Sequence, residues 1–225
     1  HSGPTGPATI TIKDGRIESI AKGNNPVPVK PGVRVIDMST KTVLPGLIDL
    51  HVHLSSDPGG DFWREATDSN EDAVVIGAKN ARITALAGFT TVRDLGAPPG
   101  VGQALRKGTA EGSIAGPRIQ TAGLAISIIG GHGDVSGFRP EVNAALDGNN
   151  TCTGANECAA RVREASKKGV DLIKITATGG VLSQQARGLE AHFTAAEMST
   201  IVDTAHSLGL KVAAHAHGAR GIEAA

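Results

Sequence analysis

The pattern that most constrains the fold is a regular alternation of strand-like and helix-like segments from residue 47 onward. Short apolar runs such as Leu47–His53 are typical of buried strands, and longer stretches such as Glu71–Ala87 are typical of helices. The five predicted strands are 47–53, 89–94, 118–123, 170–175 and 210–215. Strands that alternate with helices form a parallel sheet, so the predicted fold class is α/β.

Polar residues recur at the C-terminal ends of these strands. This favours a (β/α)8 TIM-type barrel whose first five strand-helix units are present, in residues 46–225. A doubly wound open sheet is the alternative, but no Gly-X-Gly-X-X-Gly motif follows the first strand. Thr194, with Glu197 three residues later, is a capping-box signature and predicts where one of the helices begins.

Residues 1–45 are predicted to form the N-terminal part of a small β-sandwich domain. Apolar and polar residues alternate in Ala8–Lys13 and in Arg16–Ile20, and the Asp14-Gly15 pair between them is typical of a hairpin turn. Val33–Asp37 is predicted to be a further short strand of this domain.

The composition points away from nucleic-acid and membrane partners. The formal net charge is zero, tyrosine is absent, and no apolar stretch is long enough to span a bilayer. We therefore expect no nucleic-acid partner and no membrane. The compartment stays open between the cytoplasm and the periplasm or exterior. The chain begins at His1 without a methionine, and processing can remove a signal peptide.

The two cysteines, Cys152 and Cys158, are too few for a disulfide framework, and they lie in a polar stretch of the chain. A local disulfide or a redox switch is one interpretation. We favour two free thiols, because no other feature of the sequence requires an oxidising compartment.

His51 and His53 end the first predicted barrel strand. Alternate residues of a strand point to the same side, so both imidazoles leave the strand end in one direction. We predict that they bind a divalent metal, zinc, through neutral ring nitrogens. The alternative is a pair of ordinary polar residues at a strand exit, since short histidine motifs are common.

Lys174 lies in an apolar run, Leu172–Ile175, that is predicted to be buried. A lone charged lysine is unfavourable there, and burial favours the neutral amine. A neutral amine can take up carbon dioxide to form a carbamate, an anionic oxygen ligand able to bridge two metals. The alternative is a lysine whose amine reaches solvent at the strand end.

Three further histidines complete the candidate site. His215, at the end of the fifth strand, is predicted to be the fourth metal ligand. His217 points the same way by alternation. We predict that it contacts the substrate or hydrogen-bonds a metal ligand, and the alternative is a structural role. His132 is flanked by glycines that allow close approach to a ligand, and we interpret it as a substrate-binding or electrophilic residue rather than part of a flexible surface loop. Arg93 and Asp94 are expected to form a structural ion pair nearby.

Six motifs occur in a fixed order along the chain: Asp14–Ile17, Leu44–His53, Gly88–Asp94, Gly130–Asp134, Ile173–Ile175 with Thr178–Gly180, and His215–Gly218. In combination they resemble the metal-dependent amidohydrolase superfamily. The resemblance covers essentially the whole chain. It is strongest to the branch that holds Xaa-Pro dipeptidases, related carboxypeptidase-like enzymes and ochratoxin-hydrolysing amidohydrolases, and imidazolonepropionase is a more distant relative. Within this branch, the segment Asp57–Trp63 most resembles the ochratoxin-hydrolysing members.

The resemblance implies a binuclear zinc centre. His51 and His53 would bind one metal, His215 the other, and Lys174, carboxylated by carbon dioxide, would bridge both. A hydroxide between the metals would attack an amide carbonyl. His132 matches a family position near the substrate and, with Lys174, is a predicted catalytic residue, and His132 and His217 are the predicted substrate-binding residues.

The implied activity is hydrolysis of an amide or peptide bond in an Xaa-Pro dipeptide, an N-acyl amino acid or an ochratoxin-like amide, by a homo-oligomer of the complete enzyme. The family also needs a histidine after its sixth strand and an aspartate after its eighth, and this sequence ends before both. We therefore expect the chain to be the N-terminal part of a larger enzyme. The alternatives are a cyclic-amide hydrolase resembling imidazolonepropionase, or an inactive truncated fragment that needs a second chain.

Overall fold

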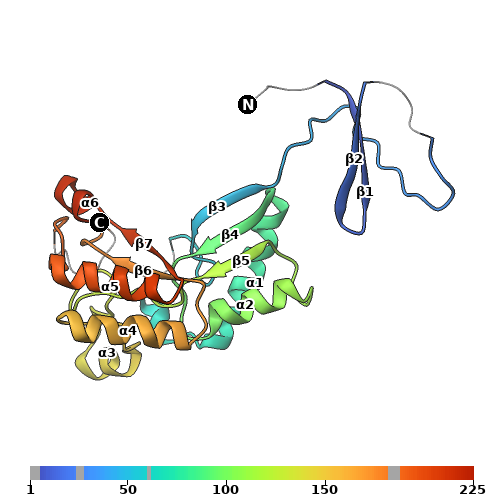
Figure 1. Cartoon of the computed structure of the whole chain (residues 1–225). Coiled ribbons are helices and arrows are strands. Elements are labelled where there is room, and N and C mark those ends of the chain that lie inside the picture. The colour runs from blue at the N-terminus through green and yellow to red at the C-terminus, as the bar shows by residue number, and fades with distance from the viewer. Residues whose placement is uncertain (1–5, 24–27, 60–61, 182–187) are drawn as a thin grey trace. The chain divides into compact units, whose positions relative to one another are not determined.

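A computed structural model describes residues 6–23, 28–59, 62–181 and 188–225. The chain divides into two compact units, His1–Pro45 and Gly46–Ala225 (Figure 1). Residues 60 and 61 of the segment Asp57–Trp63 lie outside the described residues, as does His1.

The first unit contains the predicted hairpin. Strands β1 (Ala8–Lys13) and β2 (Arg16–Lys22) pair antiparallel. Asp14 and Gly15 connect them with φ angles of +50° and +71°. Two successive positive φ angles are what a type I′ hairpin turn requires, and aspartate followed by glycine tolerates them best. The hairpin prediction is confirmed.

The predicted strand at Val33–Asp37 is wrong. This segment forms no strand, and Val33, Val35 and Ile36 are all exposed. Alternation favours an extended backbone, but a strand also needs a neighbour to complete its hydrogen bonds, and none of the described residues supplies one. The described part of this unit is therefore a single hairpin followed by chain that forms no further strand or helix, and no separate β-sandwich is seen in it.

The second unit holds five parallel strands: β3 (Leu47–Val52), β4 (Phe89–Asp94), β5 (Arg118–Thr121), β6 (Leu172–Thr176) and β7 (Lys211–His215). They form a β3-β4-β5 sheet and a β6-β7 sheet. A parallel bridge between Ile126 and Ile175 joins the segment after β5 to β6, and the Asp171 amide donates to the Thr121 carbonyl at 2.8 Å. All five predicted strands are confirmed, and neighbours follow chain order. The described residues form no closed barrel.

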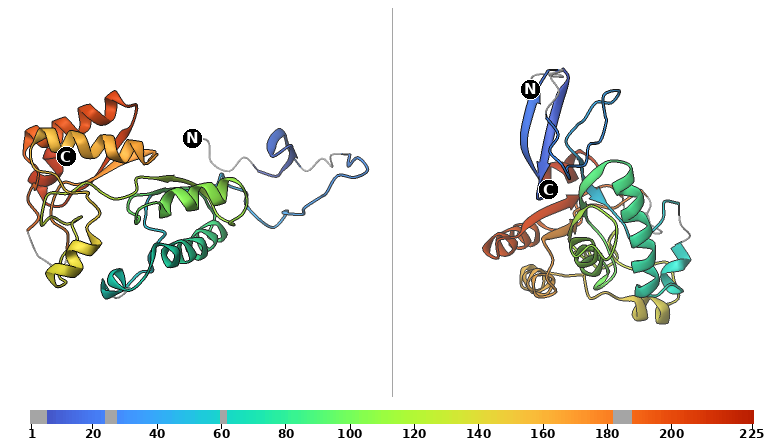
Figure 2. Two further views of the ribbon diagram at one scale, coloured as in Figure 1. Left: turned by 90° about the horizontal axis from the view of Figure 1, so that it is seen from below. Right: turned by 90° about the vertical axis from the view of Figure 1, so that its right-hand side faces the viewer.

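The helices of this unit are α1 (Asn70–Leu86), α2 (Val101–Ala110), α3 (Pro140–Leu146), α4 (Ala155–Lys167), α5 (Ala195–Ser207) and α6 (Ala219–Ala224), with a 3-10 helix at Phe62–Ala66. α1 and α2 pack together beside the β3-β4-β5 sheet, and α4 and α5 pack together beside β6 and β7 (Figures 1 and 2). Helix α3 and the 3-10 helix are not predicted from the sequence, because both are short and lack a long apolar periodicity.

The core of the second unit follows this arrangement. All five residues of β6 are buried, as expected for a central parallel strand. Helix α1 instead buries small residues, Ala73, Gly77 and Ala81. A methyl group on Gly77 would clash with the fully buried side chain of Leu105, so the small residue allows α1 and α2 to approach closely.

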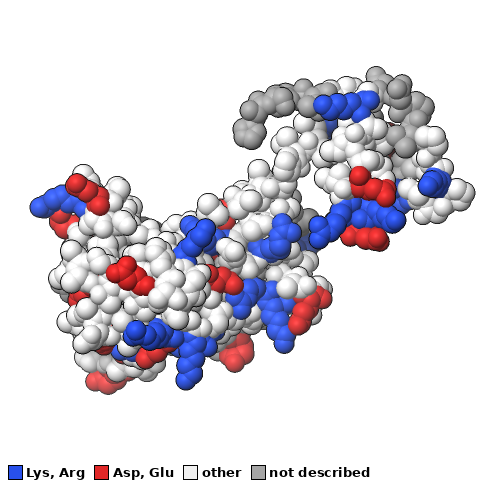
Figure 3. All heavy atoms as spheres, viewed as in Figure 1, with Lys and Arg blue, Asp and Glu red and all other residues white. Residues whose placement is uncertain are grey.

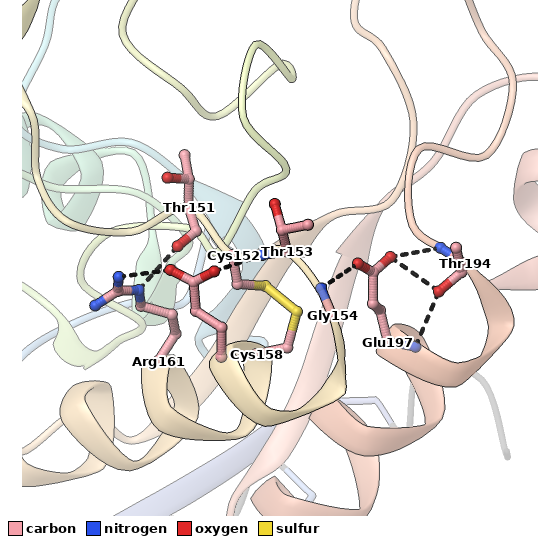
Figure 4. The surroundings of a disulfide bond; sticks show 9 residues. Thr151, Cys152, Thr153, Gly154, Cys158, Arg161, Thr194 and Glu197 are labelled. Carbon is pink, nitrogen blue, oxygen red and sulfur yellow. Dashed lines mark hydrogen bonds and ion pairs between the residues drawn. A yellow bond between two sulfur atoms is a disulfide. The ribbon is translucent and has the colours of Figure 1, made fainter.

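The two cysteines form a disulfide, so the prediction of free thiols is wrong. Cys152 precedes α4, Cys158 lies in its first turns, and both side chains are almost completely buried (Figure 4). The prediction rested on an argument about the compartment. Pairing depends instead on whether the fold brings the two side chains together, and here the start of α4 turns Cys158 back toward Cys152.

The surface carries both signs of charge. Basic and acidic side chains are interspersed over the face of the second unit seen in Figure 3. Among the described residues, no helix has the length and apolar character needed to cross a bilayer.

The capping box predicted for α5 is confirmed and provides a test of stability. The Thr194 hydroxyl accepts from the Glu197 amide at 3.3 Å, and the Glu197 carboxylate accepts from the Thr194 amide at 2.8 Å. Thr194→Ala removes one cap and should lower the free energy of unfolding by about 1 kcal/mol, measured by urea denaturation. Ser199→Ala, on the exposed side of the same helix, is the matched control and should change it by less than about 0.5 kcal/mol. Equal effects would contradict the capping role.

Candidate functional site

His51 and His53 lie at the C-terminal end of β3 with their Nε2 atoms 3.2 Å apart. The Nδ1 atom of His53 lies 3.1 Å from the Gly96 carbonyl oxygen, which can only accept. His53 Nδ1 therefore donates this hydrogen bond, which leaves Nε2, beside His51, as the ring nitrogen available to a ligand. Partial burial, and then the neighbouring charge of Lys174, lower the pKa of His51, which favours its neutral form.

The turn after β4 supports this histidine pair. A Cβ atom on Gly96 would lie 2.7 Å from the His53 ring, so the ring fits only because this residue has no side chain. Asp94, fully buried, accepts from the Gly96 amide at 3.1 Å and from the Leu54 amide at 3.3 Å. Burial raises the pKa of Asp94, while the two amide hydrogen bonds oppose that shift.

The expected ion pair between Arg93 and Asp94 is absent from the described residues. Neighbouring residues of a strand point to opposite faces, so these two side chains diverge. Arg93 Nε donates instead to the Leu50 carbonyl at 2.8 Å.

Lys174 is buried in the middle of β6. It is 3% exposed and lies between Ile173 and Ile175, each 1% exposed. Burial, reinforced by the charge of Arg93, lowers the pKa of Lys174 to about 8. A large share of this amine is therefore neutral at mildly alkaline pH, whereas an ordinary lysine is almost fully charged there.

A second histidine cluster lies at the C-terminal end of β7. The rings of His132 and His215 are 4.2 Å apart between centroids, and those of His215 and His217 are 4.6 Å apart. Burial, and then the charge of His215, lower the pKa of His132 to about 4, so this ring is neutral near pH 7. The His132 ring packs against Gly180, where any side chain would collide with it.

His192, which lies near this cluster, is not among the residues predicted from the sequence. Its charge contributes to lowering the pKa of both His132 and His215. A Cβ atom on Gly179 would come within 3.3 Å of its Nε2 atom. Its backbone amide donates to the Ala177 carbonyl at 2.8 Å, directly after β6. The available signal in the sequence was a histidine two residues before the capping Thr194.

The predicted residues thus fall into two groups at the strand ends. His51 and His53 form one group, and His132, His215 and His217 form the other. The charges of Lys174 and His215 both influence the pKa of His51, so the two groups share one electrostatic environment. Among the described residues, no three His, Cys, Asp or Glu side chains are gathered closely enough to hold a metal ion.

The first group nevertheless fits one half of a zinc site. Two nitrogens bound tetrahedrally at about 2.0–2.1 Å from zinc lie about 3.3–3.4 Å apart. The Nε2 atoms of His51 and His53 are 3.2 Å apart, and the Gly96 carbonyl fixes the tautomer that a ligand needs.

Residues 42–225 match the family model described as the amidohydrolase family. The chain belongs to the amidohydrolase family. Ochratoxinase from Aspergillus niger is 32% identical over 200 residues, which is 81% of this chain and 41% of that protein. A dihydroorotase from Chlorobaculum tepidum is 38% identical over only 64 residues.

Solved structures agree with this membership. A Xaa-Pro dipeptidase with bound methionine superposes with a TM-score of 0.82 at 35% identity, over 96% of this chain and 53% of that chain. The structure of A. niger ochratoxinase superposes with a TM-score of 0.67 at 28% identity, over 80% of this chain and 44% of that chain. This family member therefore spans about half the length of the relatives it matches.

The lowered pKa of Lys174 predicts a pH-dependent change of charge. In metal-free protein, the Lys174 side chain should lose its proton with a midpoint near pH 8, because burial disfavours the ammonium form. Lysine Cε chemical shifts, followed by NMR from pH 6 to pH 11, would report this midpoint against about 10.4 for exposed lysines. The shifted resonance should vanish in Lys174→Met. A midpoint above 10 would contradict the burial argument.

Proposed function

We propose that this chain is the N-terminal part of a zinc-dependent amidohydrolase that hydrolyses an amide or peptide bond to a C-terminal amino acid. The substrates we propose are an Xaa-Pro dipeptide, an N-acyl amino acid or an ochratoxin-like amide. Family membership supports amide hydrolysis in general, and the ochratoxinase and Xaa-Pro dipeptidase relatives favour this substrate class.

The observation that carries the proposal is the environment of Lys174. A buried lysine with a pKa of about 8 lies in the strand between two histidine groups. A lysine placed only for structure would reach solvent to keep its charge. A partly neutral amine in this position can react with carbon dioxide, which forms an N–C bond and releases one proton, to give an anionic carbamate.

The residues of the chain have distinct proposed roles. His51 and His53 would hold one metal through Nε2, and His215 would help to hold a second, with the Lys174 carbamate between them. When bound, divalent metals supply a Lewis acid for the carbonyl and lower the pKa of water. His132, neutral near pH 7, can offer a ring N–H to the substrate carbonyl, and His217 would orient the rest of the substrate.

The remaining parts of the site would come from chain beyond this sequence. We propose that three more strand-helix units close a (β/α)8 barrel and that further strands complete a small β-sandwich. The exposed apolar residues Leu47, Ile48 and Leu50 on β3 support this, because large apolar side chains of a first barrel strand are normally covered. The same completed chain would form the homo-oligomer.

Lys174→Ala tests the bridging role in the complete enzyme. It should abolish most amide hydrolysis and lower the bound metal, because the bridging anion is lost. Metal per subunit by elemental analysis and turnover of an Xaa-Pro dipeptide would be measured together. Lys211→Ala, at the exposed start of the neighbouring strand β7, is the matched control and should keep both. Two metals and parental turnover in Lys174→Ala would refute the bridge, whereas one metal in the parent would favour the cyclic-amide alternative.

Gly96→Ala tests the proposed ligand pair separately. The new methyl group would displace the His53 ring, so metal affinity should fall about 10- to 100-fold, the usual effect of disturbing a ligand's support. Competition against a chromogenic chelator gives the affinity without any substrate. Gly108→Ala, in α2, introduces a comparable clash with the Ile114 side chain and should leave metal affinity unchanged. Equal affinities in both variants would argue against His53 as a ligand.

A further inference from the structure

The loop that carries His132 is held at the next residue. The Gly133 amide donates to the Ser127 hydroxyl at 3.2 Å, and the Gly133 carbonyl accepts from the Asn150 side-chain amide at 2.8 Å. Both backbone polar groups of Gly133 are therefore fixed by side chains from outside the turn. A Cβ atom on Gly133 would lie 3.1–3.2 Å from Thr176 and Ser127, so the turn packs closely against β6.

Asn150 makes a second bond with the same amide group. It donates to the Ala125 carbonyl at 2.6 Å, so both N–H groups of the side chain are used. Its backbone carbonyl accepts from the Ser127 amide at 3.0 Å. One residue thus ties together the two ends of the segment between Ala125 and Gly133, which contains His132.

The segment after Asn150 is anchored to two helices (Figure 4). The Thr151 carbonyl accepts from Arg161 of α4 at 2.8 Å, and the disulfide joins Cys152 to Cys158 of the same helix. The Gly154 amide donates to the Glu197 carboxylate of α5 at 2.7 Å. Asn150 therefore extends from a part of the chain that α4 and α5 hold in place.

We propose that Asn150 is a positioning residue for His132. Its hydrogen bonds tie the turn at Gly133 to the segment that α4 and α5 anchor. They therefore set the position of the His132 ring relative to the His215 ring. The role in catalysis rests on the proposed function, in which His132 contacts the substrate. Asn150 itself needs no contact with the substrate.

A double-mutant cycle in the complete, metal-loaded enzyme tests this role. Asn150→Ala should lower kcat/KM about 10- to 100-fold, because small displacements of a substrate-contacting group are costly. In a His132→Ala background the same substitution should cost less than about 3-fold, since the group that it positions is already gone. Equal losses in both backgrounds would overturn the proposal.

Two controls separate positioning from stability. Asn143→Ala removes a similar asparagine, whose amide bonds the backbone of Phe138 at 3.1 and 3.3 Å, and it should leave kcat/KM within about 2-fold. Asn150→Asp keeps the size of the side chain but replaces the NH₂ group, which donates to the Ala125 and Gly133 carbonyls, with an oxygen that cannot donate. It should therefore lower kcat/KM as much as Asn150→Ala. Parental kcat/KM in Asn150→Asp would overturn the role of the two donated bonds.

Hydrogen exchange tests the same role without substrate. In Asn150→Ala, amides of residues 130–134 should exchange about 10-fold faster than in the parent, while those of β7 should not change. Unchanged exchange in that turn would overturn the proposal. If the parent enzyme were inactive but exchange in Asn150→Ala were still faster, the turn would depend on Asn150 as proposed. The proposed function, and not the positioning role, would then be wrong.

Discussion

The parallel pairing of β3 to β7 is the constraint on which the rest of the second unit depends. Strands that run the same way end at the same edge, so residues separated by more than a hundred positions come into one neighbourhood there. The bridge between Ile126 and Ile175 continues the parallel pairing from the segment after β5 to β6. In this neighbourhood the charge of Lys174 lowers the pKa of His51.

Within that alignment, Lys174 shows how the fold prepares chemistry. The strand that best satisfies the core, β6, also contains a residue that prefers water. The lysine is nevertheless buried in the core, and its pKa is lowered because burial disfavours the charged ammonium form. Gly96 and Gly180 make a related contribution, because each leaves the space that an imidazole ring occupies. At both positions the glycine backbone, with no side chain of its own, packs directly against the histidine ring.

The layer outside the strands positions the loops. The disulfide, Arg161 and Glu197 hold the stretch from Thr151 to Gly154, and Asn150 carries that restraint to the turn beside His132. The side chains involved are polar and partly buried, so each lost partner would leave an unpaired group. This makes the loop geometry a property of the whole α4 and α5 region.

By itself, the sequence determined the five strands of the second unit, the hairpin of the first unit and the identity of the polar strand ends. Alternation, apolar runs and capping are local, so the five strands, the hairpin at Asp14-Gly15 and the start of α5 were predicted correctly. The resemblance based on ordered motifs also agrees with membership of the amidohydrolase family.

Only the tertiary structure decided which side chains meet. Cys152 and Cys158 pair, Arg93 donates to the Leu50 carbonyl, and His192 joins the histidine cluster. The segment predicted as a strand at 33–37 stays unpaired among the described residues. Each of these outcomes depends on partners brought close by packing and chain direction, and such contacts leave no periodic signal in the sequence around the residue itself.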